Sequence, residues 1–367
     1  MSQQLTSEEK LRYNRHIILP EIGIEGQQKL KNTSLLVIGA GGLGCPLLQY
    51  VAAAGIGKIG IMDHDVVDAS NLHRQILFTT EDIGKPKAEV AKSKLLANNP
   101  HIEVFAIHES ISKSNALDYI NEYDIIADGS DNFATRYLVN DACIIKNKPL
   151  IFGAIFKFEG QLSVFNYKNG PSYRCLFPEQ PAADSIPTCS QIGVMGVLPG
   201  IIGSMMANEV IKVVLNSDST LSGKFLTVDI LSNNFIEFGI SRNEENFALT
   251  TLGNYHINEC TTSQIPSISV DELHESYENH VLIDIRTDDE RSLAQLPNSL
   301  HLPKDTLAES ISKIPRDQSI VVYCHFGKQS QEVVQLLLEN YGFNKVYNLE
   351  GGIHEWAQEI DASIGVY

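Results

Sequence analysis

The sequence predicts an α/β protein in which a mostly parallel sheet is followed by a second, smaller α/β domain. Apolar runs alternate with helical patterns over residues 34–146, the alternation resumes after residue 268, and a polar, aperiodic stretch separates the two parts. Strands that alternate with helices are typical of parallel sheets covered on both faces. We therefore expect domains at residues 1–245 and 268–367, joined by a linker at 246–267.

Composition excludes several classes of function. A length of 367 residues favours two domains, since single cores seldom exceed about 250–300 residues. The net charge of −17 argues against a general nucleic-acid surface. Residues 1–4 lack a signal-peptide pattern and no apolar run approaches the ~20 residues of a membrane span, so we expect a cytoplasmic protein. The six cysteines include no C-x-x-C pair and indicate neither a disulfide framework nor a complete zinc site.

The apolar run at residues 34–38 leads into a glycine-rich turn, in which Gly39, Gly41 and Gly44 match G-x-G-x-x-G. This pattern predicts a buried strand, a phosphate-binding loop and a helix over 43–54 whose free N–H groups face an anion. By itself the motif fits a dinucleotide enzyme, an ATP enzyme or a plain tight turn. Asp63 follows Gly44 by 19 residues, where a Rossmann-like unit places the carboxylate that binds ribose.

The rest of the first domain continues the alternation. Asp131 and Asn132 follow a predicted strand, and we expect them at the carboxyl edge of the sheet, where ligands of such folds bind. We predict strands at 57–63, 102–107, 123–128, 151–153, 159–165 and two within 223–238, helices at 86–98, 114–121, 133–146 and 200–215, and a crossover loop at 177–188.

The second domain contains a candidate reactive thiol. Buried strands are predicted at 281–286 and 320–323, and the second runs directly into Cys324, a short loop and a helix at 331–341. A cysteine between a parallel strand and a helix faces several backbone N–H groups, which stabilise a thiolate. We therefore favour a reactive Cys324 over a buried structural one.

Six motifs in order resemble the MoeB/ThiF family, the bacterial relatives of ubiquitin-activating enzymes. They are R-Y-N-R at 12–15, G-A-G-G-L-G at 39–44, D-x-D at 63–65, N-L-x-R-Q at 71–75, G-K-P-K at 84–87 and S-D-N at 130–132. The last hundred residues resemble a rhodanese domain, through Asp284 and Arg286, Leu296-Pro297, the Cys324 loop and L-E-G-G-I at 349–353. The resemblance implies a Rossmann-like sheet of the ubiquitin-activating-enzyme type, fused to a rhodanese domain.

The resemblance also implies a site for ATP and Mg²⁺. In it Asp63 would bind ribose, Arg74 and Lys87 the triphosphate and Asp131 the metal, while Arg15 would reach the neighbouring subunit of a homodimer. The implied nucleotide-binding set is Gly39, Gly41, Gly42, Gly44, Asp63, Asp65, Asn71, Arg74, Gln75, Lys87, Asp131 and Asn132.

The implied partner is a small ubiquitin-like sulfur carrier that ends in Gly-Gly and is adenylated on its terminal carboxylate. A Cys324 persulfide, loaded from thiosulfate or a cysteine-desulfurase persulfide, would then give a thiocarboxylate. Cys189 would form a disulfide or thioester with the carrier. The fused rhodanese domain favours the molybdopterin-synthase type of carrier over carriers of thiamine synthesis or tRNA thiolation.

Two departures from the family pattern matter. Many members hold structural zinc with two C-x-x-C pairs, but here the first has become Ser172 to Cys175 and residues 242–246 contain no cysteine, so we expect no zinc. The rhodanese loop has Lys328 and Gln329 where relatives often carry arginine. An NAD-dependent oxidoreductase, and a docking module with an inactive rhodanese domain, remain the alternatives.

Overall fold

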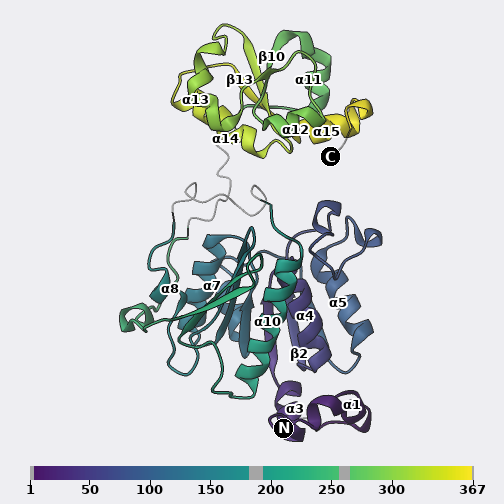
Figure 1. Ribbon diagram of the computed structural model, residues 1–367, viewed down its shortest axis with the longest axis vertical. Coiled ribbons are helices and arrows are strands. Elements are labelled where there is room, and N and C mark those ends of the chain that lie inside the picture. Colours follow the sequence, from purple (N-terminus) through teal and green to yellow (C-terminus); the bar gives the residue numbers. More distant parts are fainter. Residues whose placement is uncertain (1–3, 182–192, 256–264, 366–367) are drawn as a thin grey trace. The chain divides into compact units, whose positions relative to one another are not determined.

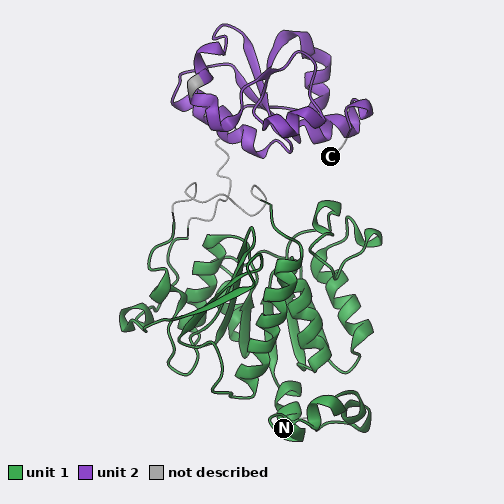
Figure 2. Ribbon diagram, in the orientation of Figure 1, with its two compact units in different colours: residues 1–257 green, residues 258–367 purple. Residues whose placement is uncertain are grey.

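The computed structural model describes residues 4–181, 193–255 and 265–365. Contacts divide the chain into two units, residues 1–257 and 258–367, so the division falls inside the expected linker (Figure 2). The early part of that stretch packs on the first unit: Leu252 is buried in its core, and the Tyr255 hydroxyl donates to Asp141 Oδ2 at 2.8 Å. The predicted domain boundaries themselves remain predictions.

The first unit is built on an eight-stranded sheet with the order β3-β2-β1-β4-β5-β6-β7-β8. Its first five strands pair in parallel, and β6, β7 and β8 extend it with antiparallel pairs. The strands are β1 (Ser34–Ile38), β2 (Lys58–Met62), β3 (Glu103–Ile107), β4 (Ile125–Asp128), β5 (Leu150–Phe156), β6 (Glu159–Phe165), β7 (Lys224–Asp229) and β8 (Asn234–Gly239).

Helices cover both faces of the parallel part (Figure 1). Because side chains alternate along a strand, Leu35 and Val37 of β1 enter one core while Leu36 and Ile38 enter the other. The helices are α1 (Ser7–Arg12), α2 (Asn14–Ile17), α3 (Gly23–Lys31), α4 (Gly44–Ala54), α5 (Lys87–Asn98), α6 (Ala116–Asn121), α7 (Phe133–Ile145), α8 (Tyr173–Leu176) and α10 (Val197–Val214).

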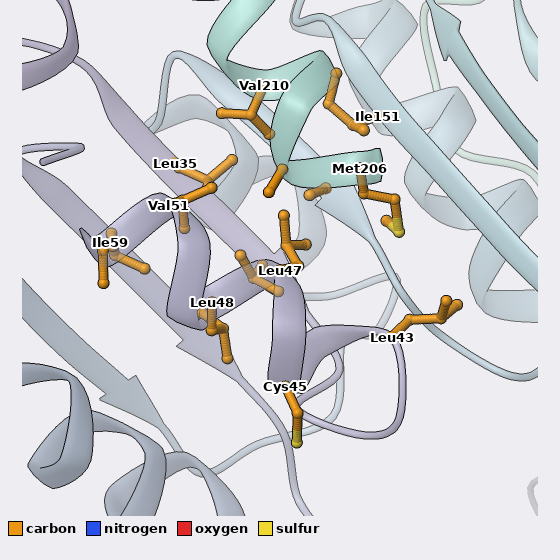
Figure 3. Close-up of a cluster of buried hydrophobic side chains, with 14 of the residues drawn as sticks. Leu35, Leu43, Cys45, Leu47, Leu48, Val51, Ile59, Ile151, Met206 and Val210 are labelled. Carbon is orange, nitrogen blue, oxygen red and sulfur yellow. The ribbon is translucent and has the colours of Figure 1, made fainter. Parts of the chain in front are cut away.

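The larger core lies beneath α4 and α10. Leu47 and Val51 of α4 meet Met206 and Val210 of α10 over the sheet, as Figure 3 shows. By length and composition α10 could cross a membrane, but 56% of it is buried inside this fold. Such burial is typical of the core helix of a folded domain.

The second unit is a five-stranded parallel sheet with the order β11-β10-β12-β13-β9. Two cores, one on each face, contain Val322 and Val334 on one side and Val321 and Trp356 on the other. Its elements are β9 (Ser267–Ile268), α11 (Val270–Ser276), β10 (His280–Asp284), α12 (Asp288–Leu293), β11 (Leu300–His301), α13 (Leu307–Ser310), β12 (Ser319–Tyr323), α14 (Lys328–Glu339), β13 (Val346–Leu349) and α15 (Gly352–Glu359).

Three predicted boundaries were wrong in instructive ways. The helix after Cys324 begins at Lys328, three residues early, because Gly327 at φ +78° lets the chain turn at once. Pro86 is the N-cap of α5 and lies outside the first turn, at ψ 127°. The apolar helix begins at Val197, so Pro199 lies in its first turn, where a missing N–H costs no hydrogen bond.

Candidate functional site

The loops after β1 and β4 meet at the carboxyl edge of the first sheet. Gly39 N donates to Met62 O at 2.8 Å, and Gly129 N donates to Ile38 O at 2.9 Å. Gly39 has φ +90°, and a Cβ there would lie 3.1 Å from Gly129 O. Only glycine therefore lets the two loops approach in this way.

The same loop leaves the start of α4 open to an anion. A Cβ on Gly44 would lie 2.0 Å from Gly39 O, so the helix must begin with glycine to pack against its own loop. Leu43, the N-cap, makes no side-chain capping hydrogen bond. The first N–H groups of α4 are thus available to a phosphate, which the helix dipole also attracts.

Acidic and basic side chains surround this loop from β2 and α5. Asp63 Oδ2 accepts from Ala40 N at 2.7 Å and its Oδ1 accepts from Asp65 N at 2.8 Å. Lys87, only 4% exposed, places Nζ 2.8 Å from Asp65 Oδ2. Asp63, His64 and Asp65 also lie close enough together to share an ion, although such acidic groups are common without one. The structure thus brings Asp63, Asp65 and Lys87 together as predicted.

Residues 71–75 lie against the glycine loop. Arg74 Nη2 donates to Asn71 Oδ1 at 2.5 Å. A Cβ on Gly42 would lie 3.7 Å from Arg74 Cγ, and one on Gly41 would lie 3.6 Å from Gln75 Nε2. Gln75 is 4% exposed, and its Oε1 has no partner among the described residues. A buried carboxamide with an unmade hydrogen bond at this point fits a bound polar ligand.

Asp131 and Asn132 occupy the third side, at the start of α7. Asn132 Oδ1 accepts from Thr135 N at 2.9 Å and caps the helix, while the Asp131 side chain is exposed. The Ser130 hydroxyl is buried with no partner among the described residues. An exposed carboxylate beside a backbone cradle and the cations Arg74 and Lys87 is a donor set that suits Mg²⁺ bound to a polyphosphate.

Arg15 does not join this cluster. It follows Tyr13, whose ring lies against Gly55 at the opposite end of α4 from the glycine loop. The 11 residues of α4 separate the two ends, a distance of about 16 Å at 1.5 Å per residue. Arg12 forms a structural contact there instead, because its Nη2 donates to Asn98 O at 2.8 Å.

The second unit holds Cys324 between β12 and α14. The residue is 3% exposed, and Ser330 Oγ donates to its Sγ at 3.4 Å. Gly327 caps α14 with no side-chain hydrogen bond, so the first turn of this helix is also open. The sulfur therefore lies in the strand–loop–helix setting that the sequence predicts.

The start of α15 fixes the Cys324 loop. Ile353 N donates to Cys324 O and His354 N donates to His325 O, both at 3.0 Å. A Cβ on Gly352 would lie 2.5 Å from each of these carbonyl oxygens. The His325 and His354 rings stack 5.5 Å apart. Burial, and secondarily the charge of His354, lowers the pKa of His325, so this imidazole stays neutral near pH 7.

Cys175 is the one cysteine at the four positions where the resemblance implies zinc ligands in many members of the family. The structure brings its Sγ within 3.3 Å of Ser172 N, 3.3 Å of Asn243 N and 3.4 Å of Asn246 Nδ2. Burial alone would raise the pKa of Cys175, but the hydrogen bonds from Asn243, Ser172 and Asn246 lower it. Only one sulfur ligand remains at these four positions, and the expected absence of zinc stays a prediction.

The other cysteines differ from these two. Burial raises the pKa of Cys45 to about 12 and that of Cys143 well above its ordinary value, as expected for small core residues on α4 and α7. Cys189 lies outside the described residues, as does most of the predicted crossover loop.

Comparison with known proteins decides the family. The ThiF family model matches residues 13–249, and the rhodanese-like domain model matches residues 269–359. The chain belongs to the ThiF family. This ThiF-family chain is 38% identical over 391 residues to a Drosophila sechellia protein named adenylyltransferase and sulfurtransferase MOCS3, covering 99% of this chain and 86% of the relative.

Two further comparisons agree. A Mycobacterium tuberculosis protein named probable adenylyltransferase/sulfurtransferase MoeZ is 38% identical over 381 residues, covering 99% of this chain and 96% of the relative. The crystal structure of Escherichia coli MccB with ATP matches with a TM-score of 0.53 and 26% identity, over 60% of this chain and 67% of that one. This ThiF-family protein is therefore an ATP-using adenylyltransferase and a sulfurtransferase.

Proposed function

We propose that this enzyme adenylates the C-terminal Gly-Gly carboxylate of a small ubiquitin-like sulfur carrier and then converts it to a thiocarboxylate through Cys324. The carrier favoured is of the molybdopterin-synthase small-subunit type, in the cytoplasm. The observation that supports the proposal is that one chain combines an open phosphate cradle, flanked by Arg74 and Lys87, with a thiol in the loop between β12 and α14.

In the first step the carrier carboxylate attacks the α-phosphorus of ATP, and pyrophosphate leaves. Two anions approach each other, so the enzyme's task is to orient them and to neutralise charge. The N–H groups of the glycine loop, Arg74 and Lys87 would hold the phosphates, and Asp63 would hold the ribose. Mg²⁺, held by Asp131, would supply further positive charge on the phosphate oxygens.

In the second step sulfur reaches the activated carbonyl. The Cys324 thiolate takes the outer sulfur of thiosulfate, releasing sulfite, or of a cysteine-desulfurase persulfide, releasing that enzyme's thiolate. The resulting persulfide anion attacks the acyl carbon, and AMP leaves. A second thiol then cleaves the sulfur–sulfur bond, forms a disulfide with Cys324 and releases the thiocarboxylate. Cys189 is the candidate for a covalent link to the carrier.

The position of Arg15 supports a homodimer. Arg15 lies at the end of α4 far from its own glycine loop, so it could meet phosphates only in a second copy. Three apolar residues near Arg15 in the sequence are well exposed: Leu11 at 81%, Ile18 at 59% and Ile24 at 49%. Exposed apolar patches of this kind are typical of protein interfaces.

The test is ATP–pyrophosphate exchange by the full-length protein with Mg²⁺ and each candidate Gly-Gly carrier. Exchange that requires both the carrier and Asp131 is expected, and the carrier that supports it identifies the pathway. Asp131→Asn should abolish most exchange, whereas Asp118→Asn, a matched change on α6, should not. Folded protein that binds ATP but exchanges with no carrier would favour the docking-module alternative.

A further inference from the structure

Two buried charged side chains lie beneath the loop that presents Asp131. Asp128, the last residue of β4, is 1% exposed, and Arg136, near the start of α7, is 9% exposed. Among the described residues, Asp128 Oδ2 and Arg136 Nε make no hydrogen bond, and the charge of Arg136 acts on Asp128 without a direct ion pair between them. Burying polar atoms without hydrogen bonds costs free energy, so these two side chains call for a role beyond packing.

Both side chains hold the backbone of the same residue. Asp128 Oδ1 accepts from Ser130 N at 2.9 Å, and Arg136 Nη2 donates to Ser130 O at 3.3 Å. The Ser130 carbonyl belongs to the peptide unit that leads into Asp131. Fixing Ser130 at its N–H and at its carbonyl therefore fixes where the Asp131 side chain begins.

The guanidinium itself is held in place. The Arg136 Cζ lies 5.1 Å from the Phe133 ring centroid and 5.7 Å from that of Phe152. Phe152 of β5 lies directly opposite Asp128 of β4 in the sheet. The ring that contacts Arg136 of α7 therefore belongs to the strand residue paired with Asp128. Cation–π contacts with these two rings favour one position of the Arg136 guanidinium.

We propose that Asp128 and Arg136 are positioning residues that hold the Asp131 carboxylate where Mg²⁺ binds with ATP. The inference rests on the proposed function, in which Asp131 is the metal ligand. Partners that orient a ligating side chain commonly change metal affinity 10–100-fold when removed. Their effect should therefore appear in the Mg²⁺ dependence of ATP binding and be small when Mg²⁺ is absent.

The experiment measures ATP affinity by calorimetry at a series of Mg²⁺ concentrations, with the full-length protein. Asp128→Ala and Arg136→Met should each raise the Mg²⁺ concentration for half-maximal enhancement about tenfold. Asp128→Asn keeps an oxygen that can accept from Ser130 N and should restore the normal value. A residue needed only for folding would show no such rescue.

Arg174→Met is the matched control. Arg174 forms an ion pair with Asp141 of α7, with Nε 2.7 Å from Oδ1, and no described contact links it to Ser130. Its loss should lower the melting temperature and leave the Mg²⁺ dependence unchanged. Should Asp128→Ala not fold, Arg136→Met and Asp128→Asn still decide the question.

Two results would overturn the inference, and they differ. If ATP binding by the unaltered protein does not depend on Mg²⁺, the metal assignment of Asp131 fails and this inference fails with it. If the unaltered protein shows the dependence and Arg136→Met shows the same half-maximal concentration, the positioning role alone is wrong.

Discussion

The β1–α4 turn and the β12–α14 turn have similar backbones and different side chains. In both, a glycine at positive φ lets a buried parallel strand run into a helix that has no side-chain cap. The first turn contains no nucleophile and is ringed by charged residues from other elements. The second turn contains a thiol of its own, Cys324, which is almost fully buried.

The two turns differ in where the group that they surround comes from. In the proposed function the first turn must recognise a diffusible phosphate each time, and Arg74, Lys87 and Asp131 are the residues proposed to do so with Mg²⁺. The thiol of the second turn is part of the chain itself, and the Ser330 hydroxyl donates to its Sγ at 3.4 Å.

The largest effect is expected at the thiol. Cys324→Ser should reduce sulfur transfer about a thousandfold or more, because the serine hydroxyl cannot form a persulfide. ATP–pyrophosphate exchange should persist, since the first turn is untouched. Cys175→Ser is the control and should leave both activities near normal. Sulfur transfer that survives in Cys324→Ser would show that the second turn is not the sulfur site.

The next effect concerns the glycines. Gly44→Ala would place a Cβ 2.0 Å from Gly39 O, and Gly327→Ala one 2.7 Å from Leu349 O at φ +78°. Overpacking should destabilise each by about 1–3 kcal/mol. We expect Gly44→Ala to lower ATP affinity at least about tenfold and Gly327→Ala to impair only sulfur transfer, as calorimetry and thiosulfate turnover would show.

Gly200→Ala is the control for both changes. Gly200 lies in α10, and a Cβ added there would meet no atom within 4 Å. Alanine is the better helix former by about 1 kcal/mol. The melting temperature should therefore stay the same or rise, and either activity should be unchanged. Equal loss of ATP affinity in Gly44→Ala and Gly200→Ala would contradict the loop argument.

Cys175, in the short helix α8, tests whether backbone and side-chain hydrogen bonds can lower a thiol pKa outside the two turns compared above. Its pKa lies below the ordinary value of 9.0, so thiolate should form, and alkylation should accelerate, at a lower pH than for an exposed cysteine. Asn246→Ala removes one donor and should shift the profile upward. Iodoacetamide rates against pH, read by peptide mass spectrometry, measure this. Cys45 should not react over the same range.

The smallest effect is expected at Asn132, which caps α7 and is also predicted to bind nucleotide. Asn132→Ala should cost about 1 kcal/mol of stability through loss of the cap. Asn132→Ser keeps the cap and removes the carboxamide, so it should retain stability and weaken ATP binding only a few-fold. Comparing melting temperature with ATP affinity separates the two roles. Equal ATP affinity in Asn132→Ser and the unaltered protein would leave capping as its sole role.

The sequence predicted most of the architecture because its signals are local. Each signal lies within a short stretch of the chain. Examples are the apolar run before Gly39, the spacing from the glycine loop to Asp63, and the thiol that follows residues 320–323. The meeting of Gly39 with Gly129, and of residues 71–75 with the glycine loop, follows from parallel strands ending at one edge.

Other features depend on contacts between distant segments, and no local pattern reports those. The sequence pattern places Asp128 at the end of a buried strand. Only the structure shows that its Oδ1 accepts a hydrogen bond from Ser130 N. Ser330 became a contact of Cys324 because α14 begins early, at Lys328. The R-Y-N-R motif likewise gives no sign that the Arg12 side chain donates to Asn98 O, 86 residues further along the chain.

The hydrogen bonds from α15 to the Cys324 loop have a consequence for biosynthesis. The loop is translated well before Ile353 and His354, whose N–H groups hold its carbonyls. During synthesis the nucleotide-binding unit can therefore be complete while the thiol loop still lacks its support. A chain that stopped before Gly352 would contain the whole first unit but lack the two N–H groups that hold the Cys324 loop, so the support of this loop is the later of the two to be translated.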